Sequence, residues 1–438
     1  MKKLIKKVAP RGLLHLYHLA LAYAGAIRYG FPTRRLVVIG VTGTRGKTTT
    51  ANLIWSILTA AGYTVGLTGT ANIRVGSTEE LNPYHMTMPG RFAMHALLAR
   101  MVRAGCEIAV VETPSEGIEQ YRHRGITYDA AVLTSLYPEY LETHGWNYDR
   151  LKSQIEELFA SLAGHPHKKL RGAPVPKTMV IPAGLEDKAR FLTHPADKKI
   201  LYGTGDGTHI QATNITSTAE GVRFVVDGKT YGLKLVGSFN VENALAAIAL
   251  ARALGIPDAE TARGLARLET VPGRMEAIGT GRPFTVFVDY AHDGPSIEAA
   301  CRAAREIAAA RGGRVVLVLG GEGGGRDKKK RPIMGECAAR LADIVVVSNV
   351  DPYDDDPVEI IEDIARASER AGKVRGKNLF TIEDRRSGIR MALELAAEGD
   401  VVLITGKGAE QALIVGPTTL AWDDRTVTRE ELTRQKET

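Results

Sequence analysis

Residues 36 to 50 read LVVIGVTGTRGKTTT, an apolar run that leads into a glycine turn, a lysine and three threonines. This order predicts a buried strand, a phosphate-binding loop and the start of a helix, although Val41 stands where the common G-x-x-x-x-G-K-[ST] pattern has its first glycine. Glycines let backbone N–H groups approach an anion, and the positive end of the helix faces it. Lys47 would reach the terminal phosphates and the Thr48 hydroxyl would ligate Mg²⁺. The predicted nucleotide-binding residues are Gly43, Thr44, Gly46, Lys47, Thr48 and Thr49.

Length and composition are those of a globular protein with two or three domains. The chain has 438 residues, of which 44% are hydrophobic and 24% charged. A formal charge of +7 and a pI near 9.1 favour an anionic partner. The sequence has no basic stripe with interleaved aromatic residues, so a substrate with phosphates and carboxylates is expected and nucleic acid is not. Three cysteines far apart in sequence predict reduced thiols of a cytoplasmic protein.

Residues 1–33 are expected to form a separate basic and apolar helix. Four lysines precede an apolar stretch, Leu13 to Ile27, that resembles a signal peptide. Export would strand the phosphate loop without ATP, and the stretch is shorter than the ~20 residues that cross a bilayer. Because it is apolar nearly all round, it must pack on the body of the protein, which is the favoured interpretation, or attach to the inner leaflet of a membrane.

From Leu36 onward, short apolar runs alternate with helical patterns, as in a mainly parallel sheet with helices on both faces. Residues 178–236 change character, with alternation in GVRFVVDGKTYGLKL (221–235) and an Asp-Gly turn at 227–228, which predicts an antiparallel portion. The fold class is therefore predicted to be α/β, with a phosphate-loop domain over 34–270. Further expected elements are strands at 63–70, 107–113 and 130–136 and a helix at 91–104.

The pattern restarts at VPGR, residues 271–274, where a domain boundary is predicted. The following alternation predicts a Rossmann-like doubly wound domain over 271–438. It has no phosphate loop, so it is expected to bring a substrate to the nucleotide held by the first domain. Its predicted strands are 285–290, 314–320, 343–349 and 400–406, and its helices are 295–311, 332–342, 357–371 and 385–397.

Polar residues follow most of the predicted strands. Glu112 ends the strand at 107–113, where a nucleotide-binding domain places an acidic Mg²⁺ ligand. Polar clusters at 289–292, 321–332, 351–357 and 406–411 follow the four strands of the second domain. Each cluster alone could be a solvated surface, but the carboxyl ends of parallel strands meet at one edge, so we expect a binding site there.

Taken together, these motifs resemble the Mur ligases, with the strongest likeness to members that add the third amino acid to a muramoyl dipeptide. The motifs occur in family order from about residue 34 to the end. They are T-G-T-x-G-K-T-T in the loop, Glu112, N-V-E-N at 240–243, P-G-R-M-E at 272–276, D-Y-A-H at 289–292, R-D-K-x-K-R-P at 326–332 and G-K-G-x-E at 406–410.

The resemblance implies an ADP-forming amide ligase of peptidoglycan precursor synthesis that uses ATP and Mg²⁺. Members phosphorylate a carboxylate, and an incoming amine attacks the acyl phosphate to give an amide, ADP and phosphate. The partners implied are a muropeptide, either UDP-linked or lipid-linked, and a free amino acid.

The resemblance also assigns roles by position. Thr48 and Glu112 would bind metal, and the catalytic group would be Lys47, Glu112, Lys152 and His144, with Lys152 a candidate for carbamylation. Further nucleotide contacts would be Asn243, Arg274, Asp289 and His292. The substrates would meet Thr87, Pro89, Ser115, Arg326, Asp351, Tyr353, Gly406 and Glu410.

Several positions depart from the family pattern. Tyr140 stands where the family places a metal-binding histidine, and His144, one helical turn later, is the expected substitute. Arg45 replaces the usual asparagine of the loop, and Pro114 replaces a serine. Tyr353 stands where enzymes that select diaminopimelate have an arginine. We therefore expect meso-diaminopimelate not to be the preferred amino acid.

Only about 35 residues precede the first strand, whereas peptide-adding members of the family have a UDP-binding domain there. This domain is therefore expected to be absent, and the N-terminal helix suggests a lipid-linked acceptor or a partner.

Two rival functions remain open. Folylpolyglutamate synthase shares the mechanism, but its loop typically reads G-K-G-S where this chain has GKTT. A non-catalytic or regulatory homologue is the other rival, raised by Tyr140 and Pro114.

Overall fold

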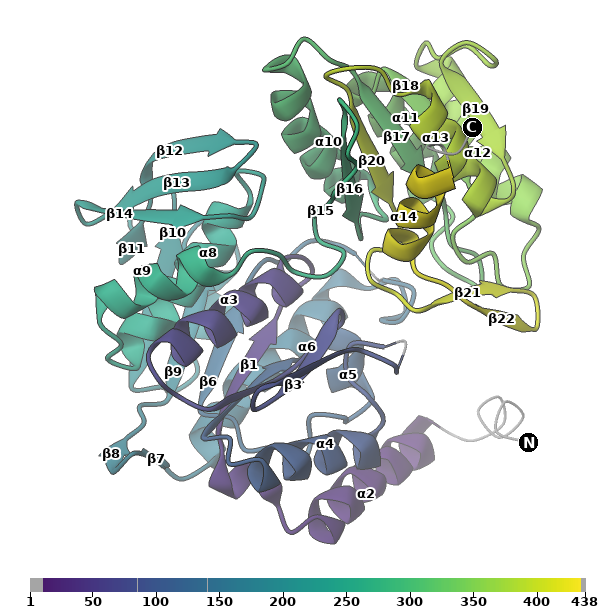
Figure 1. The fold of residues 1–438 in the computed structure, drawn as a ribbon. Coiled ribbons are helices and arrows are strands. Elements are labelled where there is room, and N and C mark those ends of the chain that lie inside the picture. The colour runs from purple at the N-terminus through teal and green to yellow at the C-terminus, as the bar shows by residue number, and fades with distance from the viewer. Residues whose placement is uncertain (1–10, 85, 140, 435–438) are drawn as a thin grey trace. The chain divides into compact units, whose positions relative to one another are not determined.

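The computed structural model describes residues 11–84, 86–139 and 141–434, with side chains described from residue 14 onward (Figure 1). The chain divides into two compact units. The first contains most of the chain up to Leu268. The second contains residues 269–438 and two short earlier segments, 216–222 and 233–239. Each unit is built on its own sheet.

The sheet of the first unit has nine strands in the order β11-β10-β9-β6-β1-β5-β2-β3-β4. Pairing is parallel from β11 to β2 and antiparallel for β3 and β4. Every residue of the central strand β1 is buried, as expected for a parallel strand covered on both faces. The strands are β1 (Val37–Thr42), β2 (Val65–Thr68), β3 (Asn72–Val75), β4 (Thr78–Leu81), β5 (Ile108–Glu112), β6 (Ala130–Leu133), β9 (Thr178–Pro182), β10 (Lys198–Gly203) and β11 (Ile210–Gln211).

The prediction of an antiparallel portion from about 178 to 236 is wrong for its first half. Strands β9, β10 and β11 extend the large sheet in parallel. The helix between β9 and β10, α7 (Lys188–Leu192), has only five residues, so the sequence shows no clear crossover helix. Residues 213–233 instead form a separate three-stranded sheet of β12 (Thr213–Thr218), β13 (Gly221–Val226) and β14 (Lys229–Leu233).

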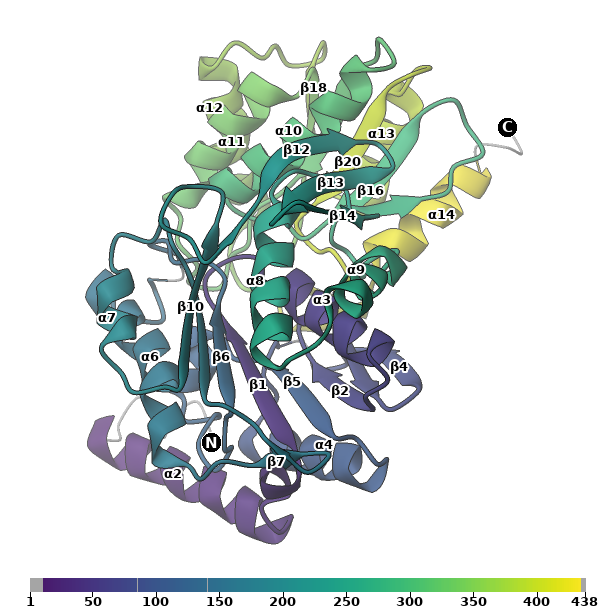
Figure 2. The same ribbon diagram turned by 90° about the vertical axis from the view of Figure 1, so that its left-hand side faces the viewer.

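Helices cover both faces of the large sheet. On one face, α3 (Lys47–Ala60) contacts α8 (Asn240–Ala253) and α9 (Asp258–Arg267), a grouping that is clear in Figure 2. On the other face, α4 (Arg91–Arg103) and α6 (Tyr148–Ser161) contribute to one apolar core with alternate residues of the strands. This three-layer arrangement confirms the predicted α/β class.

The second unit has a six-stranded sheet in the order β15-β16-β20-β17-β18-β19, parallel except for β15. Its strands are β15 (Glu276–Ile278), β16 (Thr285–Asp289), β17 (Val315–Leu319), β18 (Ile344–Ser348), β19 (Leu379–Ile382) and β20 (Val401–Thr405). One core packs beneath α10 (Gly294–Ala309), α11 (Lys330–Leu341) and α12 (Pro357–Arg370). The opposite core packs beneath α13 (Arg385–Leu395) and α14 (Asp424–Arg434). A hairpin of β21 (Ala412–Val415) and β22 (Thr418–Ala421) follows β20.

The first described helix, α2 (Arg11–Arg28), lies alongside α4 in both views (Figures 1 and 2). Ala22 and Ala26 are fully buried, whereas four large apolar side chains are exposed: Leu16 (62%), Tyr17 (57%), Tyr23 (44%) and Ile27 (65%). The helix therefore packs on the body through small residues and leaves an apolar face in water. Within the described residues, no helix combines the length and the apolar character needed to span a membrane.

Candidate functional site

The turn between β1 and α3 has the geometry of a phosphate-binding loop. Gly43 and Gly46 have φ angles of 133° and 78°, which favour glycine. A Cβ at Gly46 would lie 2.3 Å from Oδ1 of Asn243, so the close approach also requires glycine. Nζ of Lys47 donates to the carbonyl oxygens of Gly43 (2.8 Å) and Thr44 (3.0 Å). The lysine thus folds over the turn at the N-terminal end of α3, where an anion would be attracted.

Oxygen atoms gather at the neighbouring strand end. The hydroxyl of Thr48 donates to Oε2 of Glu112 over 3.1 Å. The backbone N–H of Thr70 donates to the other carboxylate oxygen at 3.0 Å, and its hydroxyl donates to Oε2 at 3.0 Å. Thr70 also shares a hydroxyl hydrogen bond of 2.8 Å with Thr87. A buried carboxylate beside hydroxyls is a ligand set that suits Mg²⁺.

Thr70 was not among the predicted site residues. Its only signal is its position at the end of the expected strand at 63–70. The nearby Pro89 is buried just before α4, and Thr49 is buried on α3. Oδ1 of Asn243 accepts a hydrogen bond from the hydroxyl of Thr50 (3.3 Å), and its amide nitrogen donates one to Oδ1 of Asn240 (3.0 Å). Asn243 therefore lies against the start of α3.

The segment after β6 closes the other side of the loop. The hydroxyl of Ser135 accepts from the backbone N–H of Arg45 at 2.8 Å. The guanidinium of Arg45 pairs with Glu139 and lies 4.7 Å from the ring centroid of Tyr137. Tyr140, the position that departs from the family histidine, lies outside the described residues.

His144, the expected substitute, contacts Ser115 instead of Glu112 or Thr48. Its Nε2 lies 3.0 Å from Oγ of Ser115. Burial lowers the pKa of His144, which favours the neutral imidazole. The structure therefore joins His144 to a predicted substrate contact. Across the described residues, no three His, Cys, Asp or Glu side chains are grouped as metal ligands.

Lys152 is held away from these groups by two carboxylates. Its ammonium lies 2.8 Å from Asp149 and 2.9 Å from Asp187, above the ring of Tyr148. Hydrogen bonds to Asp149 and Asp187 raise the pKa of Lys152. Carbamylation requires the neutral amine, which this environment disfavours.

In the second unit, two predicted nucleotide contacts, Asp289 and His292, lie at or just after the end of β16. The carboxylate of Asp289 accepts the backbone N–H groups of Met275 (2.7 Å) and Ala291 (2.8 Å), while burial raises its pKa. Nδ1 of His292 lies 2.9 Å from the carbonyl oxygen of Tyr290. The guanidinium of Arg274 lies over the ring of the same tyrosine at 4.3 Å. The backbone N–H of Gly406 reaches the Asp289 carbonyl at 3.2 Å, so these residues share one strand end.

A buried lysine joins two predicted substrate contacts. Nζ of Lys407 lies 2.7 Å from Asp351 and 2.6 Å from Glu410, which also accepts the Tyr290 hydroxyl at 3.3 Å. Burial opposes the charge on Lys407, but Glu410 and Asp351 outweigh it and raise the pKa of the lysine. Lys407 was missed among the site residues, although the sequence places it in the cluster at 406–411.

Glu322 was also missed, and it lies beside the predicted carboxylate-binding arginine. Its Oε2 is 3.4 Å from Arg326 and 3.7 Å from Lys330. Burial alone would raise the pKa of Glu322, but Lys330, His292, Arg326 and Lys407 lower it to about 2. Tyr353, with φ of 52°, donates its backbone N–H to Ile414 at 3.3 Å. A Cβ at Gly324 would lie 2.8 Å from the Tyr353 ring, so this ring packs on the same loop as Glu322 and Arg326.

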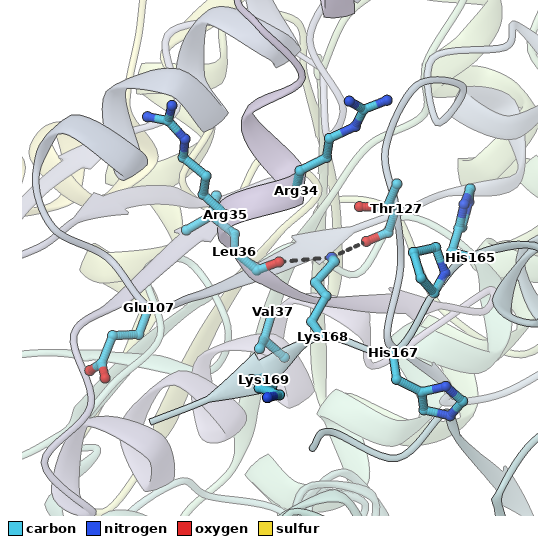
Figure 3. Close-up of a pocket in the computed structure, with 11 residues that line it drawn as sticks. Arg34, Arg35, Leu36, Val37, Glu107, Thr127, His165, His167, Lys168 and Lys169 are labelled. Atoms are coloured by element: carbon cyan, nitrogen blue, oxygen red, sulfur yellow. Dashed lines mark hydrogen bonds between the residues drawn. The ribbon is translucent and has the colours of Figure 1, made fainter. Parts of the chain in front are cut away.

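A pocket of about 570 Å³ lies at the opposite end of β1 from the phosphate loop (Figure 3). It is lined partly by cations, but Nζ of Lys168 donates to the carbonyl oxygens of Leu36 (2.8 Å) and Thr127 (2.7 Å) and to Asp129 (2.6 Å). Figure 3 shows Arg34 and Arg35 pointing away from Lys168. The central cation is thus used in joining the segments that lead into β1 and β6, and the phosphate loop remains the better candidate site.

Both units match domains of one family. Residues 41–251 match the Mur ligase middle domain, and residues 273–408 match the Mur ligase glutamate ligase domain. The UDP-N-acetylmuramyl-tripeptide synthetase of Roseiflexus sp. is 37% identical over 425 residues, covering 94% of this chain and 82% of the relative. The UDP-N-acetylmuramoyl-L-alanyl-D-glutamate--2,6-diaminopimelate ligase of Geobacillus kaustophilus is 38% identical over 416 residues, with 94% and 81% covered.

Solved structures share the fold at lower identity. MurF from Acinetobacter baumannii superimposes with a TM-score of 0.66 at 18% identity, covering 95% of this chain and 80% of that one. Folylpolyglutamate synthase from Mycobacterium tuberculosis, with ADP and AMPPCP, gives 0.67 at 21% identity, covering 89% and 92%. At such identities the likeness speaks for the fold alone, so it does not favour the folate rival. The matches to both domains and the sequence identity over 94% of its length show that the chain belongs to the Mur ligase family of ATP-dependent, ADP-forming amide ligases.

Proposed function

We propose that the chain joins a free amino acid to a muramoyl-peptide carboxylate, with ATP and Mg²⁺, during peptidoglycan precursor synthesis in the cytoplasm. The observation that carries the proposal is the loop at Gly43–Lys47 next to the Thr48–Glu112 hydrogen bond. Together they place backbone N–H groups, a lysine, a hydroxyl and a carboxylate within one strand-end cluster, which suits a nucleotide triphosphate with its cation.

The proposed roles in the first unit follow from these contacts. Lys47 and the N-terminal end of α3 bind the phosphates, Thr48 and Glu112 hold Mg²⁺, and Asn243 borders the nucleotide. When bound, the cation would neutralise charge that develops as the γ-phosphoryl group moves to the substrate carboxylate. Thr70 orients Glu112, and Thr87, Pro89, Ser115 and His144 form the wall for the muropeptide.

The second unit would supply the amine. Arg326 pairs with the carboxylate of the amino acid, and Asp351, Tyr353, Gly406 and Glu410 surround its side chain. The amine attacks the acyl carbon, phosphate leaves and an amide forms, with the amine proton passing to solvent or a nearby base. Arg274, Asp289 and His292 are proposed as further nucleotide contacts. Lys152 stays a prediction as the carbamylated lysine.

The proposed domains are residues 1–33, 34–270 and 271–438. For the first of these, we propose peripheral contact with an anionic membrane. The exposed apolar face of α2 supports this, together with a sequence that has no aspartate or glutamate before Glu79.

Phosphate release tests the proposal. The protein is mixed with ATP, Mg²⁺, a UDP-linked or lipid-linked muramoyl dipeptide and single amino acids, and the amide product is identified by mass spectrometry. Turnover that needs both the muropeptide and an amino acid is expected, and Lys47→Ala should abolish it. Turnover only with tetrahydrofolate and glutamate would favour the folate rival, and ATP binding without any turnover would favour the regulatory one.

A further inference from the structure

Arg45 is fixed inside the phosphate loop by its own backbone. Its N–H donates to Oγ of Ser135 at 2.8 Å. Its carbonyl oxygen accepts the hydroxyls of Thr134 (2.5 Å) and Ser135 (3.1 Å). Both hydroxyls come from the segment directly after β6. The main chain at this position is therefore held on its donor and its acceptor side, which restricts where the Arg45 side chain can reach.

The side chain lies between an aromatic ring and a carboxylate. The guanidinium pairs with Glu139 and lies 4.7 Å from the ring centroid of Tyr137, with the Arg45 side chain 26% exposed. Glu139 is more deeply placed, at 14% exposed, and its Oε2 is buried without a hydrogen-bond partner among the described residues. A buried carboxylate oxygen left unsatisfied is unfavourable, so this ion pair is an inefficient structural clamp.

Two cations belong to the loop at Gly43–Lys47, which leads into the N-terminus of α3. Lys47 folds over the turn, and Arg45 lies two residues before it in the sequence. Without an anion, like charges so close repel each other, and Glu139 supplies a counter-charge. A guanidinium can bind two phosphate oxygens at once, which an ammonium cannot do with the same geometry.

We propose that Arg45 contacts the terminal phosphate of the bound nucleotide triphosphate, and that Glu139 and Tyr137 hold it ready when the phosphate is absent. The inference rests on the proposed function of the loop. Arg45 then adds a second positive charge beside the phosphoryl group that Lys47 also binds.

Nucleotide affinity provides the test, independent of turnover. Calorimetry would measure the Kd of the full chain for Mg²⁺ with AMP-PNP, a non-hydrolysable triphosphate, and for Mg²⁺ with ADP. We expect Arg45→Asn to weaken AMP-PNP binding by about tenfold or more and ADP binding by less than about threefold. Arg45→Lys should recover part of the loss, because it keeps the charge but not the planar fork.

Glu139→Gln separates the proposal from a purely structural clamp. Removing this negative charge should leave AMP-PNP binding unchanged or tighten it, whereas a clamp predicts that Glu139→Gln and Arg45→Asn both weaken it. Arg171 offers a matched control, because its guanidinium lies 4.3 Å from the Tyr63 ring and pairs with Glu107, the residue before β5 and therefore at the opposite end of that strand from Glu112. Arg171→Asn should change neither affinity.

If Arg45→Asn weakened the binding of AMP-PNP and of ADP equally, or if Glu139→Gln weakened the binding of AMP-PNP, the proposed role of Arg45 would be overturned. The loop would remain a nucleotide site in either case. Failure of the unmodified protein to bind either nucleotide would instead overturn the proposed function. Thermal unfolding of each variant without nucleotide verifies that the fold is retained.

Discussion

The hydroxyl of Thr48 and Oε2 of Glu112 lie 3.1 Å apart, although 64 residues separate them in the sequence. Thr48 is in the first turn of α3, and Glu112 is the last residue of β5. The parallel pairing of β1 with β5, in which Val41 is opposite Glu112, brings the two together. Sheet order therefore creates the proposed metal site from one residue at a helix start and one at a strand end.

Glu112→Gln should remove the Mg²⁺ dependence of nucleotide binding. The substitution keeps the shape of the side chain but removes the negative charge that the cation would meet. We expect the factor by which Mg²⁺ strengthens AMP-PNP binding to be at least about tenfold smaller in the variant than in the unmodified protein. We expect the rate of phosphate release to fall by about 100-fold or more. Titration of the nucleotide at several Mg²⁺ concentrations measures the first effect.

Glu80→Gln is the matched control for this substitution. Glu80 is on β4, with a side chain that is 46% exposed and paired with Arg100. It should retain the unmodified response to Mg²⁺. Unchanged Mg²⁺ dependence in Glu112→Gln would show that the Thr48–Glu112 pair does not hold the cation.

Acid should destabilise the first unit through a buried histidine. His123 is 2% exposed, and its ring nitrogens have no hydrogen-bond partner among the described residues. Burial, followed by the charge of Arg124, lowers its pKa to about 3, whereas Glu157 is 3.7 Å away. Between pH 6.5 and pH 3 the unfolded chain therefore binds a proton that the folded chain does not. The contribution of the neutral His123 to the free energy of unfolding is fully present above about pH 6.5. It is lost as the pH falls toward 3, by up to about 5 kcal/mol in total.

His123→Leu should flatten this dependence. Denaturant unfolding at several pH values between 7 and 4 would give a smaller loss of unfolding free energy in the variant, by as much as about 1.4 kcal/mol per pH unit. Identical slopes for His123→Leu and the unmodified protein would show that His123 does not titrate between these states.

The apolar face of α2 should bind anionic lipid. Leu16 and Ile27 are 62% and 65% exposed, and α2 contains no acidic residue. We expect the full chain to float with vesicles that contain phosphatidylglycerol, more weakly with pure phosphatidylcholine, and less at high salt. Leu16→Ser with Ile27→Ser should abolish flotation.

A control pair comes from the second unit. Val358 and Val374 are 52% and 53% exposed, so Val358→Ser with Val374→Ser removes similar apolar surface elsewhere. This variant should float like the unmodified chain. Absence of flotation in the unmodified chain, or equal flotation of the Leu16 and Ile27 variant, would exclude the membrane role of this face.

The sequence was sufficient for most of the fold because the parallel strands are continuous apolar runs. The predicted strands at 285–290 and 400–406 correspond to β16 and β20, and the predicted helix at 91–104 corresponds to α4. The prediction failed where apolar runs were short or half exposed. β10 has an exposed and partly buried pattern, and the prediction included it in the antiparallel portion, although it pairs in parallel with β9.

The site was less predictable because hydrogen bonds depend on positions in space. Glu112 and Asp351 were predicted as site residues because they follow or end predicted strands. The sequence around Thr70 did not predict its two hydrogen bonds to Glu112. Lys407 had a visible signal in the cluster at 406–411, yet its burial between Asp351 and Glu410 required the folded loops. Lys152 shows the opposite case. Its spacing from Tyr148 made it a candidate catalytic residue, and the structure places its ammonium on α6 beside Asp149 and Asp187.

Selection of the amino acid should depend on Tyr353. Its backbone is fixed by hydrogen bonds with Ile414 and Gly416, and its ring packs against Gly324, in the loop that also carries Arg326. A phenol offers no charge to the second carboxylate of meso-diaminopimelate, whereas an arginine could bind that carboxylate through two hydrogen bonds. We therefore expect the unmodified protein to use lysine or another amino acid in preference to meso-diaminopimelate.

Tyr353→Arg should shift this preference. We expect the ratio of kcat/KM for meso-diaminopimelate to that for lysine to rise by about tenfold or more, because a charge-assisted pair replaces a neutral contact. Tyr353→Phe keeps the ring without the hydroxyl and should retain the original ratio. Competition assays with both amino acids in one mixture measure the ratio directly. If meso-diaminopimelate outcompeted lysine in the unmodified protein, selection would have to come from groups other than residue 353.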